Sequence, residues 1–253
     1  MRDMILTKDD IYKGNLILVN ADYPSPDVES TRLVQVDAAR PGVRFAQKAA
    51  SMLRLIFEQI GCAGKILPVS GYRSRLEQAR IYSDSLRENG AEFTKKYVAL
   101  PGCSEHQTGL AIDLALKKDC IHPICPDFPD EGICGVFRQN AHKYGLIERY
   151  QRGKEAITGI AHEPWHFRYV GDPHAEIMGR YGFVLEEYID FLRQFPRDGS
   201  CLEGNSDGKG FTIYFVPLSD NHSTAILLPD DVVCEISGNN ADGCIVTEWR
   251  DAG

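Results

Sequence analysis

Apolar residues recur at helical spacing in the first quarter of the chain. Over 42–60 they follow one another at steps of three and four residues, at Val43, Ala46, Ala50, Leu53, Phe57 and Ile60. This spacing places them on one face of a helix, and Gly61 directly afterwards favours a helix end. The pattern therefore predicts a core helix over 42–60.

A short apolar run at 66–69 precedes the turn-like segment Ser70-Gly71-Tyr72-Arg73-Ser74. We expect the run to form a strand that leads into this turn. Ser74 and Glu77 have the spacing of a capping box, in which each residue bonds the backbone of the other. A second helix is therefore predicted from about residue 75 to Gly90.

Residues 110–116 alternate in the manner of a strand. Leu110, Ile112, Leu114 and Leu116 fall on one face, and Ala111, Asp113 and Ala115 fall on the other. A carboxylate between two alanines has small neighbours, so the pattern predicts open space beside Asp113, as a pocket or a metal site requires.

The segment from Lys117 to Gly135 is rich in Pro, Asp, Gly and Cys and reads as a long loop before a short helix that ends near Gly145. Its length is compatible with an active-site rim and with a bland surface insertion. Further on, we expect a strand at 165–170, a helix N-cap at Asp172, and helices over 174–194 with a break near Gly182.

Glycine, aspartate and asparagine turns separate short alternating runs after Pro196. The whole pattern predicts an α+β fold, in which an antiparallel sheet carries the functional site, helices pack on that sheet, and a small C-terminal β appendage follows. We expect a catalytic domain over 1–195 and the appendage over 196–253.

Composition narrows the function. The chain has 253 residues, 43% of them hydrophobic and 25% charged, which is ordinary for a globular protein. Its 36 acidic and 28 basic residues give a net charge of -8, which argues against a nucleic-acid partner or an anionic lipid surface. No segment approaches the roughly 18 apolar residues of a membrane span, and the charged N-terminus does not look like a signal peptide. We expect a cytoplasmic protein without a membrane anchor.

Eight cysteines would suit a disulfide framework in a secreted protein, but the expected location predicts reduced thiols. Cys120, Cys125 and Cys134 cluster with His122 in the long loop. Their spacing fits no zinc finger or ribbon, so the sequence leaves the role of this loop open.

The strongest candidate chemistry lies in two segments, 104–113 and 163–168. His106, Asp113 and His166 would supply two imidazoles and one carboxylate, a set that leaves a fourth position open on a catalytic zinc ion. Gly109 permits the turn that would fold His106 back over Asp113. Pro164 interrupts regular strand geometry, so that Glu163 could lie beside the metal without binding it. Each residue alone is weak, since a single histidine is more often structural, and the conjunction carries the hypothesis.

The blocks SGYRS at 70–74, SEHQTGLAID at 104–113 and EPWHFRYV at 163–170 resemble the signature blocks of zinc D,D-peptidases of the VanY and VanX type. The resemblance is closest to the soluble bifunctional VanXY enzymes of vancomycin resistance. It covers about residues 15–194 in the right order, and the tail after Pro196 lies outside it.

The resemblance implies one zinc ion held by His106, Asp113 and His166, with Glu163 as the catalytic base and Arg73 as an electrophilic clamp on the scissile carbonyl. It also implies that Ser104 and Gln78 contact substrate, although the Ser104 hydroxyl could instead cap its turn. Trp165 could form both core and pocket wall. VanY-type enzymes usually carry a membrane anchor or export segment, and none is visible in this sequence. This difference favours a cytoplasmic enzyme that acts on dipeptide or precursor.

The implied function is zinc-dependent hydrolysis of D-Ala-D-Ala, as the free dipeptide or at the end of the peptidoglycan pentapeptide precursor, which would lower the number of termini that bind vancomycin. An endolysin-type peptidase that cuts another wall bond and a non-catalytic zinc-scaffold binding module are the alternatives. The sequence leaves open the preference between the two substrates, the tolerance for D-Ser or D-lactate ends, and the oligomeric state.

Overall fold

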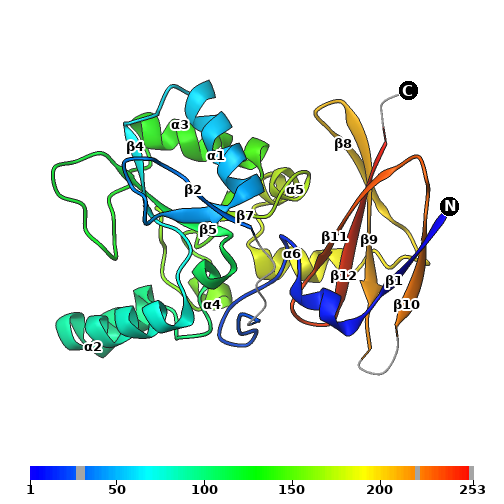
Figure 1. The fold of residues 1–253 in the computed structure, drawn as a ribbon, viewed down its shortest axis with the longest axis horizontal. Helices are drawn as coiled ribbons and strands as arrows, with labels where there is room; N and C mark the ends of the chain where they lie inside the picture. The colour runs from blue at the N-terminus through cyan, green and yellow to red at the C-terminus, as the bar shows by residue number, and fades with distance from the viewer. Residues whose placement is uncertain (27–31, 220–222, 251–253) are drawn as a thin grey trace. The chain divides into compact units, whose positions relative to one another are not determined.

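The computed structural model describes residues 1–26, 32–219 and 223–250 of the chain, which divide into two compact units. An α+β unit contains 19–25 and 32–184, and a β unit contains 1–18 and 185–250, as far as these residues are described. The mixture of helices and antiparallel sheets agrees with the predicted α+β class (Figure 1).

The α+β unit is built around a four-stranded antiparallel sheet. Its strands, in spatial order, are β4 (Ile66–Ser70), β5 (Ala111–Leu116), β7 (His166–Tyr169) and β6 (Leu146–Glu148). Pro68 lies on β4, at an edge of the sheet, where a residue without a backbone N–H is tolerated. The strands predicted near 66–69, 110–116 and 165–170 are confirmed.

The two faces of this sheet serve different purposes. Phe167 on β7 packs against Phe137 of α3 (Gly132–Ala141), with ring centroids 4.9 Å apart, and Phe137 contacts Phe57 of α1 (Gln47–Gln59) at 5.9 Å. Side chains alternate along a strand, so the residues before and after Phe167 point to the opposite face. Helices α1 and α3 therefore cover the apolar face, and the polar side chains of β5 and β7 occupy the other.

Helix α1 begins later than predicted. Residues Arg44–Ala46 form β3, which pairs with β2 (Leu33–Gln35) in a separate two-stranded antiparallel sheet. Strand pairing holds the backbone of Ala46 extended, with ψ at 136°, and the helix starts only at Gln47. The expectation of a helix over the whole of 42–60 was wrong, because hydrophobic periodicity gives no information about a partner strand that lies elsewhere in the chain.

Helix α2 (Arg75–Tyr97) has the predicted capping box, since Ser74 and Glu77 bond each other's backbone. Gly90 leaves the helical region, with φ at 82°, but the helix resumes and continues to Tyr97. The hydroxyl of Thr94 bonds the Gly90 carbonyl at 2.9 Å. This bond links the two parts, so the predicted helix end at Gly90 is a kink rather than a terminus.

The segment after β5 runs as a loop over 117–131 into α3, and η3 (His142–Tyr144) follows and ends at Gly145 as predicted. A short helix, α4 (Glu155–Thr158), precedes β7.

Helices α5 (His174–Tyr181) and α6 (Leu185–Leu192) flank Gly182, which confirms the predicted break. The predicted N-cap at Asp172 is one residue too early, because the N-cap position falls on Pro173, whose side chain makes no capping bond.

The β unit pairs an N-terminal strand with the C-terminal region. Strand β1 (Arg2–Leu6) runs antiparallel to β10 (Thr224–Leu228), and η1 (Lys8–Tyr12) follows β1. The other sheet has the spatial order β11 (Val233–Gly238), β12 (Gly243–Arg250), β9 (Lys209–Pro217) and β8 (Leu202–Ser206). The strands expected after Pro196 are present, and the functional division at residue 195 stays a prediction.

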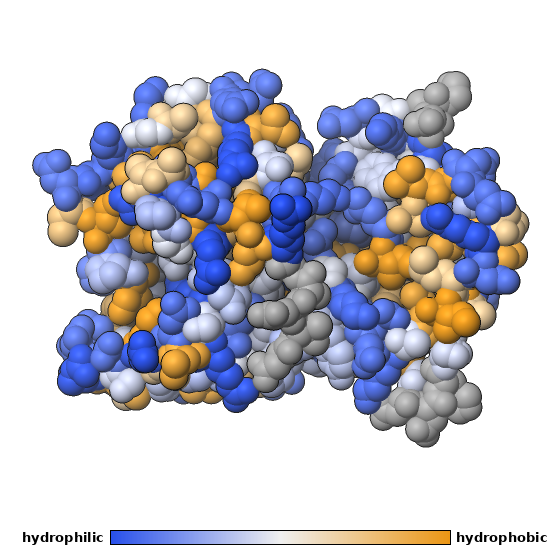
Figure 2. All heavy atoms as spheres, in the orientation of Figure 1, coloured by the Kyte–Doolittle hydropathy of each residue, from blue (hydrophilic) through white to orange (hydrophobic). Residues whose placement is uncertain are grey.

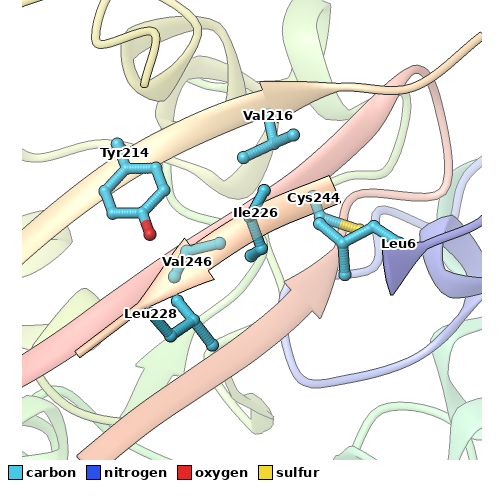
Figure 3. Packing of buried hydrophobic residues seen from close by; sticks show 7 residues of the cluster. All are labelled: Leu6, Tyr214, Val216, Ile226, Leu228, Cys244 and Val246. Carbon is cyan, nitrogen blue, oxygen red and sulfur yellow. The ribbon is translucent and has the colours of Figure 1, made fainter. Parts of the chain in front are cut away.

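A hydrophobic core joins these two sheets of the β unit (Figure 3). It consists of buried side chains from four strands, namely Leu6, Tyr214, Val216, Ile226, Leu228, Cys244 and Val246. Cys244 lies directly opposite Val216, and Val246 lies opposite Tyr214. The burial of these apolar surfaces stabilises the pairing of β1 with β10, because a lone two-stranded ribbon is marginal in water.

No helix among the described residues combines the length and the apolar character that crossing a membrane requires. The face seen in Figure 2 intersperses hydrophobic and polar residues in both units. Ile5 and Leu227 are exposed hydrophobic side chains of the β1–β10 pair.

Replacement of Gly71 by alanine tests the close contact at the end of β4. A Cβ there would lie 2.1 Å from the carbonyl oxygen of Arg44, so we expect Gly71→Ala to lower the free energy of unfolding by about 1–3 kcal/mol. Gly42→Ala is the control, because its Cβ would meet nothing within 4 Å. Urea unfolding measures both. Equal midpoints for the two variants would contradict the crowding.

Candidate metal centre and cavity

Strands β5 and β7 bring the two candidate segments together. Asp113 and His166 are directly opposite in the register, and Asp113 Oδ1 lies 3.1 Å from His166 Nδ1. His106 comes from η2 (Glu105–Thr108), and its Nε2 lies 3.3 Å from Asp113 Oδ2. Gly109 ends η2 with φ at 72°, which confirms the predicted turn. Asp113 and His106 lie 53 and 60 positions before His166 in the sequence. Sheet pairing and the turn at Gly109 bring the three side chains together.

These three side chains form a donor set that suits a metal ion. One ligand atom from each of His106, Asp113 and His166 lies within 4.8 Å of the others, and all three residues are buried. Asp113 Oδ1 is buried, and no described residue makes a hydrogen bond to it. Two imidazole nitrogens and one carboxylate oxygen, with an unpaired oxygen aimed into the set, are the ligands that a catalytic zinc site uses. Within the described ranges, no cysteine joins a cluster of this kind.

The two imidazoles are oriented differently. His106 Nδ1 lies 2.7 Å from the carbonyl oxygen of Gly71, so its Nε2 is left to face Asp113. His166 faces Asp113 through Nδ1. Burial lowers the pKa of His106 to about 4. Burial also lowers the pKa of His166, but the carboxylates of Asp113 and Glu105 outweigh it and raise that pKa to about 9.

Glu163 lies beside the donor set without belonging to it. Its Oε2 is 3.7 Å from His166 Nδ1, and a turn through Pro164 is closed by a bond from His166 N to the Glu163 carbonyl at 3.1 Å. The predicted displacement of Glu163 from regular strand geometry is therefore confirmed. Burial raises the pKa of Glu163 to about 8, and the negative charge of Asp113 acts in the same direction. A carboxyl group with such a pKa is suited to proton transfer near neutral pH.

Arg73 reaches the same point from the turn after β4. Its Nη2 donates to Asp113 Oδ2 at 2.6 Å, its Nε donates to Ser70 Oγ at 2.8 Å, and its Nη1 donates to Gln78 Oε1 at 3.2 Å. The buried Gln78 also donates to the carbonyl oxygen of Ala99 at 2.8 Å. Gln78 therefore fixes Arg73 and ties α2 to the segment that follows it.

A cavity of about 200 Å³ unites all the predicted site residues. Its walls include Arg73, Gln78, Ser104, His106, Asp113, Glu163, Trp165 and His166. The indole of Trp165 lies 6.4 Å from the ring of Tyr97, and both rings line the cavity. Pro123 and Ile124 also line it, which makes the long loop a rim of the site. Of the two interpretations of this loop, the rim is the one that the structure supports.

Sequence reasoning misjudged part of the cavity wall. Asp113 lines the cavity, so the open space predicted beside it is present, but Ala111 and Ala115 are fully buried and do not line that space. Ala111 instead lies directly opposite Arg168, where a small side chain leaves room for the guanidinium. The sequence also missed wall residues along α2, just after it and near α4, among them Ile81, Tyr97, Val98, Ala99 and Ile160. Tyr97, Val98 and Ala99 lie beyond the predicted helix end at Gly90, so their place in the cavity depends on the continuation of α2 past the kink.

A buried charge cluster behind His166 was also missed. Glu105 Oε1 accepts from Arg149 Nε at 2.8 Å and lies 2.9 Å from Arg168 Nη1, and all three side chains are fully buried. Burial opposes ionisation of Glu105, but Arg149 and Arg168 hold its pKa well below the ordinary value. The alternation of His166 and Arg168 on one strand face was the available signal.

Comparison with known proteins agrees with this geometry. Residues 43–172 match the family VanY, described as D-alanyl-D-alanine carboxypeptidase. The chain is 43% identical over 186 residues to the bifunctional D-Ala-D-Ala dipeptidase and D-Ala-D-Ala carboxypeptidase VanXYC of Enterococcus gallinarum, covering 73% of this chain and 98% of the relative. A D-alanyl-D-alanine carboxypeptidase of Enterococcus faecium is 35% identical and covers 97% of this chain and 78% of its own length.

Solved structures add a likeness over almost the whole chain. The D,D-dipeptidase VanXYg, solved with a D-Ala-D-Ala phosphinate analogue, superposes with a TM-score of 0.95 at 50% identity and covers 98% of this chain and 99% of that one. VanYB in complex with D-Ala-D-Ala gives a TM-score of 0.58 at 32% identity over 70% of this chain and 97% of that one. Both the fold and the family that the three sequence blocks implied are confirmed. The chain belongs to the VanY family of D-alanyl-D-alanine carboxypeptidases.

Proposed function

We propose that this chain is a zinc-dependent D,D-peptidase that hydrolyses D-Ala-D-Ala, both as the free dipeptide and as the end of the peptidoglycan pentapeptide precursor. The observation that carries the proposal is the convergence of His106, Asp113, His166, Glu163 and Arg73 on one small cavity. The bifunctional relative and the structure solved with a dipeptide analogue support both substrates. Removal of these termini would lower the number of sites that vancomycin can bind.

His106, Asp113 and His166 would hold the metal, and a relative solved with Zn(II) supports zinc as its identity. When bound, zinc supplies Lewis acidity, because it lowers the pKa of water toward about 7 and polarises carbonyl groups. With three protein ligands, the metal would have room for a water molecule or the substrate. We place this catalytic site in the α+β unit, and the predicted cytoplasmic location remains a prediction.

Glu163 is the proposed base. It lies close to the donor set, and its raised pKa, caused first by burial, matches a group that takes a proton from water and passes it to the leaving amine. Acid–base groups of this kind contribute roughly 10²–10⁴ in rate. A carboxyl group with the ordinary, lower pKa would be a weaker base and would take the proton from water less readily.

Arg73 is the proposed clamp on the scissile carbonyl. Ser70 and Gln78 hold its guanidinium at the cavity wall. The oxygen that gains negative charge during attack would be stabilised by this fixed cation. Ser104 and Trp165 line the remaining wall, where we propose that they contact the substrate together with Gln78.

Two alternatives remain distinguishable by assay. L,D-carboxypeptidase LdcB is similar in structure, with a TM-score of 0.58 at 34% identity, so another wall-peptide bond is the second candidate. Coverage favours the D,D-bond, because LdcB spans 68% of this chain and VanXYg spans 98%. A non-catalytic module is disfavoured, because such a module has no chemical need for a buried Glu163 and a positioned Arg73.

The proposed activity is tested by measuring D-Ala release from the free dipeptide and from the pentapeptide precursor side by side. We expect turnover of both, loss of both after treatment with a zinc chelator, and recovery after zinc is added. L-Ala-D-Glu and L,D-linked peptides serve as controls and should remain intact. Cleavage of a control peptide alone would assign the enzyme to the second candidate.

Glu163→Gln removes the base but keeps the shape of the side chain. We expect kcat for the dipeptide to fall by about 10²–10⁴ while the zinc content stays at the wild-type level, because Glu163 lies outside the donor set. Steady-state kinetics and metal analysis measure the two quantities. Wild-type turnover in the zinc-loaded variant would remove Glu163 from the role of base.

Arg73→Lys keeps the positive charge but loses the planar, forked group that bonds Ser70 and Gln78. We expect kcat to fall by about 10²–10³, the loss typical of removing one stabilising donor, with a smaller change in KM. A variant that raises KM and leaves kcat unchanged would show that Arg73 binds the substrate without assisting the chemistry.

A further inference from the structure

We propose that Glu105 is a positioning residue, whose Oε2 accepts the Nε2–H of His166 and so holds this imidazole ready to bind metal through Nδ1. The inference rests on the proposed metal site and extends it to a residue outside the ligand set. Glu105 follows Ser104 and precedes His106 in sequence, yet it acts on the other histidine.

Two orphaned atoms carry the proposal. Within the part of the chain that the structure describes, His166 Nε2 and Glu105 Oε2 are both buried without a hydrogen-bond partner, and they lie 3.6 Å apart. An imidazole that binds metal through Nδ1 carries its proton on Nε2, and this proton needs an acceptor. The separation exceeds the usual hydrogen-bond range of roughly 2.7–3.2 Å by a few tenths of an ångström, so a small tilt of the ring would close the bond.

The carboxylate of Glu105 is held in place for this task. Both arginine contacts fall on Oε1, from Arg149 Nε at 2.8 Å and from Arg168 Nη1 at 2.9 Å, which leaves Oε2 for His166. Arg149 follows β6 and its backbone N–H donates to the His166 carbonyl at 3.1 Å, while Arg168 lies on β7 itself. The acceptor is therefore fixed to the strand that carries the ligand.

The two histidines thus have different supports. His106 Nδ1 lies 2.7 Å from the Gly71 carbonyl oxygen, a neutral acceptor, whereas His166 faces a carboxylate. A charged acceptor makes an imidazole more basic and a stronger metal ligand. If Glu105 only neutralised the two arginines, its removal would change folding and leave the metal affinity of the folded protein intact.

Glu105→Gln inverts the polarity of the contact. Because Arg149 donates to Oε1 and the Arg168 guanidinium lies 2.9 Å from the same atom, the amide oxygen should occupy that position, and the amide NH₂ should point at His166 Nε2. A donor there favours the tautomer with the proton on Nδ1, which opposes metal binding through that atom. We expect the zinc affinity to fall about 10–100-fold, measured by competition with a chromophoric chelator.

Controls separate positioning from stability. Glu248→Gln makes the same change at a buried carboxylate of the β unit, which accepts from Tyr214 at 2.9 Å, and should leave zinc affinity unchanged. Glu105→Asp keeps the charge but shortens the side chain by one methylene, so it should fold more readily than Glu105→Gln and still bind zinc less tightly. Thermal unfolding of each metal-free variant reports its stability.

The wild-type protein provides a measurement that needs no variant. Nitrogen-15 spectra of the zinc-loaded chain should show one ligand imidazole protonated at Nδ1, for His106, and one protonated at Nε2, for His166. The Nε2 proton should be shifted downfield and exchange slowly. If Glu105→Gln fails to fold, these spectra and Glu105→Asp decide the question.

The outcomes also separate this inference from the proposed function. A wild-type chain that binds no zinc defeats the proposed function. A wild-type chain that binds zinc, together with a folded Glu105 variant of equal zinc affinity, overturns the inference alone. A His166 resonance protonated at Nδ1 in the zinc-loaded protein also overturns it.

Discussion

Antiparallel pairing of β5 with β7 is the constraint on which the site depends. In this register Asp113 lies directly opposite His166, and Ala111 lies opposite Arg168. A slip of one residue would turn every side chain of β5 to the other face and bury Asp113 against the aromatic rings of α3. The Phe167 and Phe137 contact holds the apolar face of β7 against α3, and the side chains of the candidate metal site lie on the opposite face of the same strand.

Burying several charged side chains near the β5–β7 pair costs free energy, and the structure offsets this cost by pairing each charge with a neighbour of opposite charge. Asp113 meets two imidazoles and Arg73, and Glu105 meets two arginines. Ionic groups removed from water are tolerated only when each is paired and hydrogen-bonded. Two buried oxygen atoms, on Asp113 and Glu105, have no hydrogen-bond partner among the described residues. A bound metal ion would account for the first, and the proposed bond from His166 would account for the second.

Much of the fold and the site could be predicted from local patterns. The alternation at 110–116 indicated a strand, the Ser74–Glu77 spacing indicated a helix start, and Gly109 indicated the turn over Asp113. Patterns that depend on remote partners failed. Ala46 is held extended by β2, and Ala111 lies opposite Arg168 and does not line the cavity. Neither β2 nor Arg168 lies in the stretch of sequence around the residue that it contacts, so a local pattern cannot reveal either contact.

The sequence by itself determined the donor chemistry, because residue types and short-range spacing fix which atoms can bind a metal or move a proton. Only the tertiary structure decided which nitrogen of His166 faces Asp113, that Glu105 stands behind His166 rather than His106, and that Pro123 and Ile124 reach the cavity. These outcomes depend on side-chain directions and on contacts between distant segments. Side-chain burial and strand pairing across the whole sheet determine these contacts, so they cannot be predicted from any one segment of the sequence.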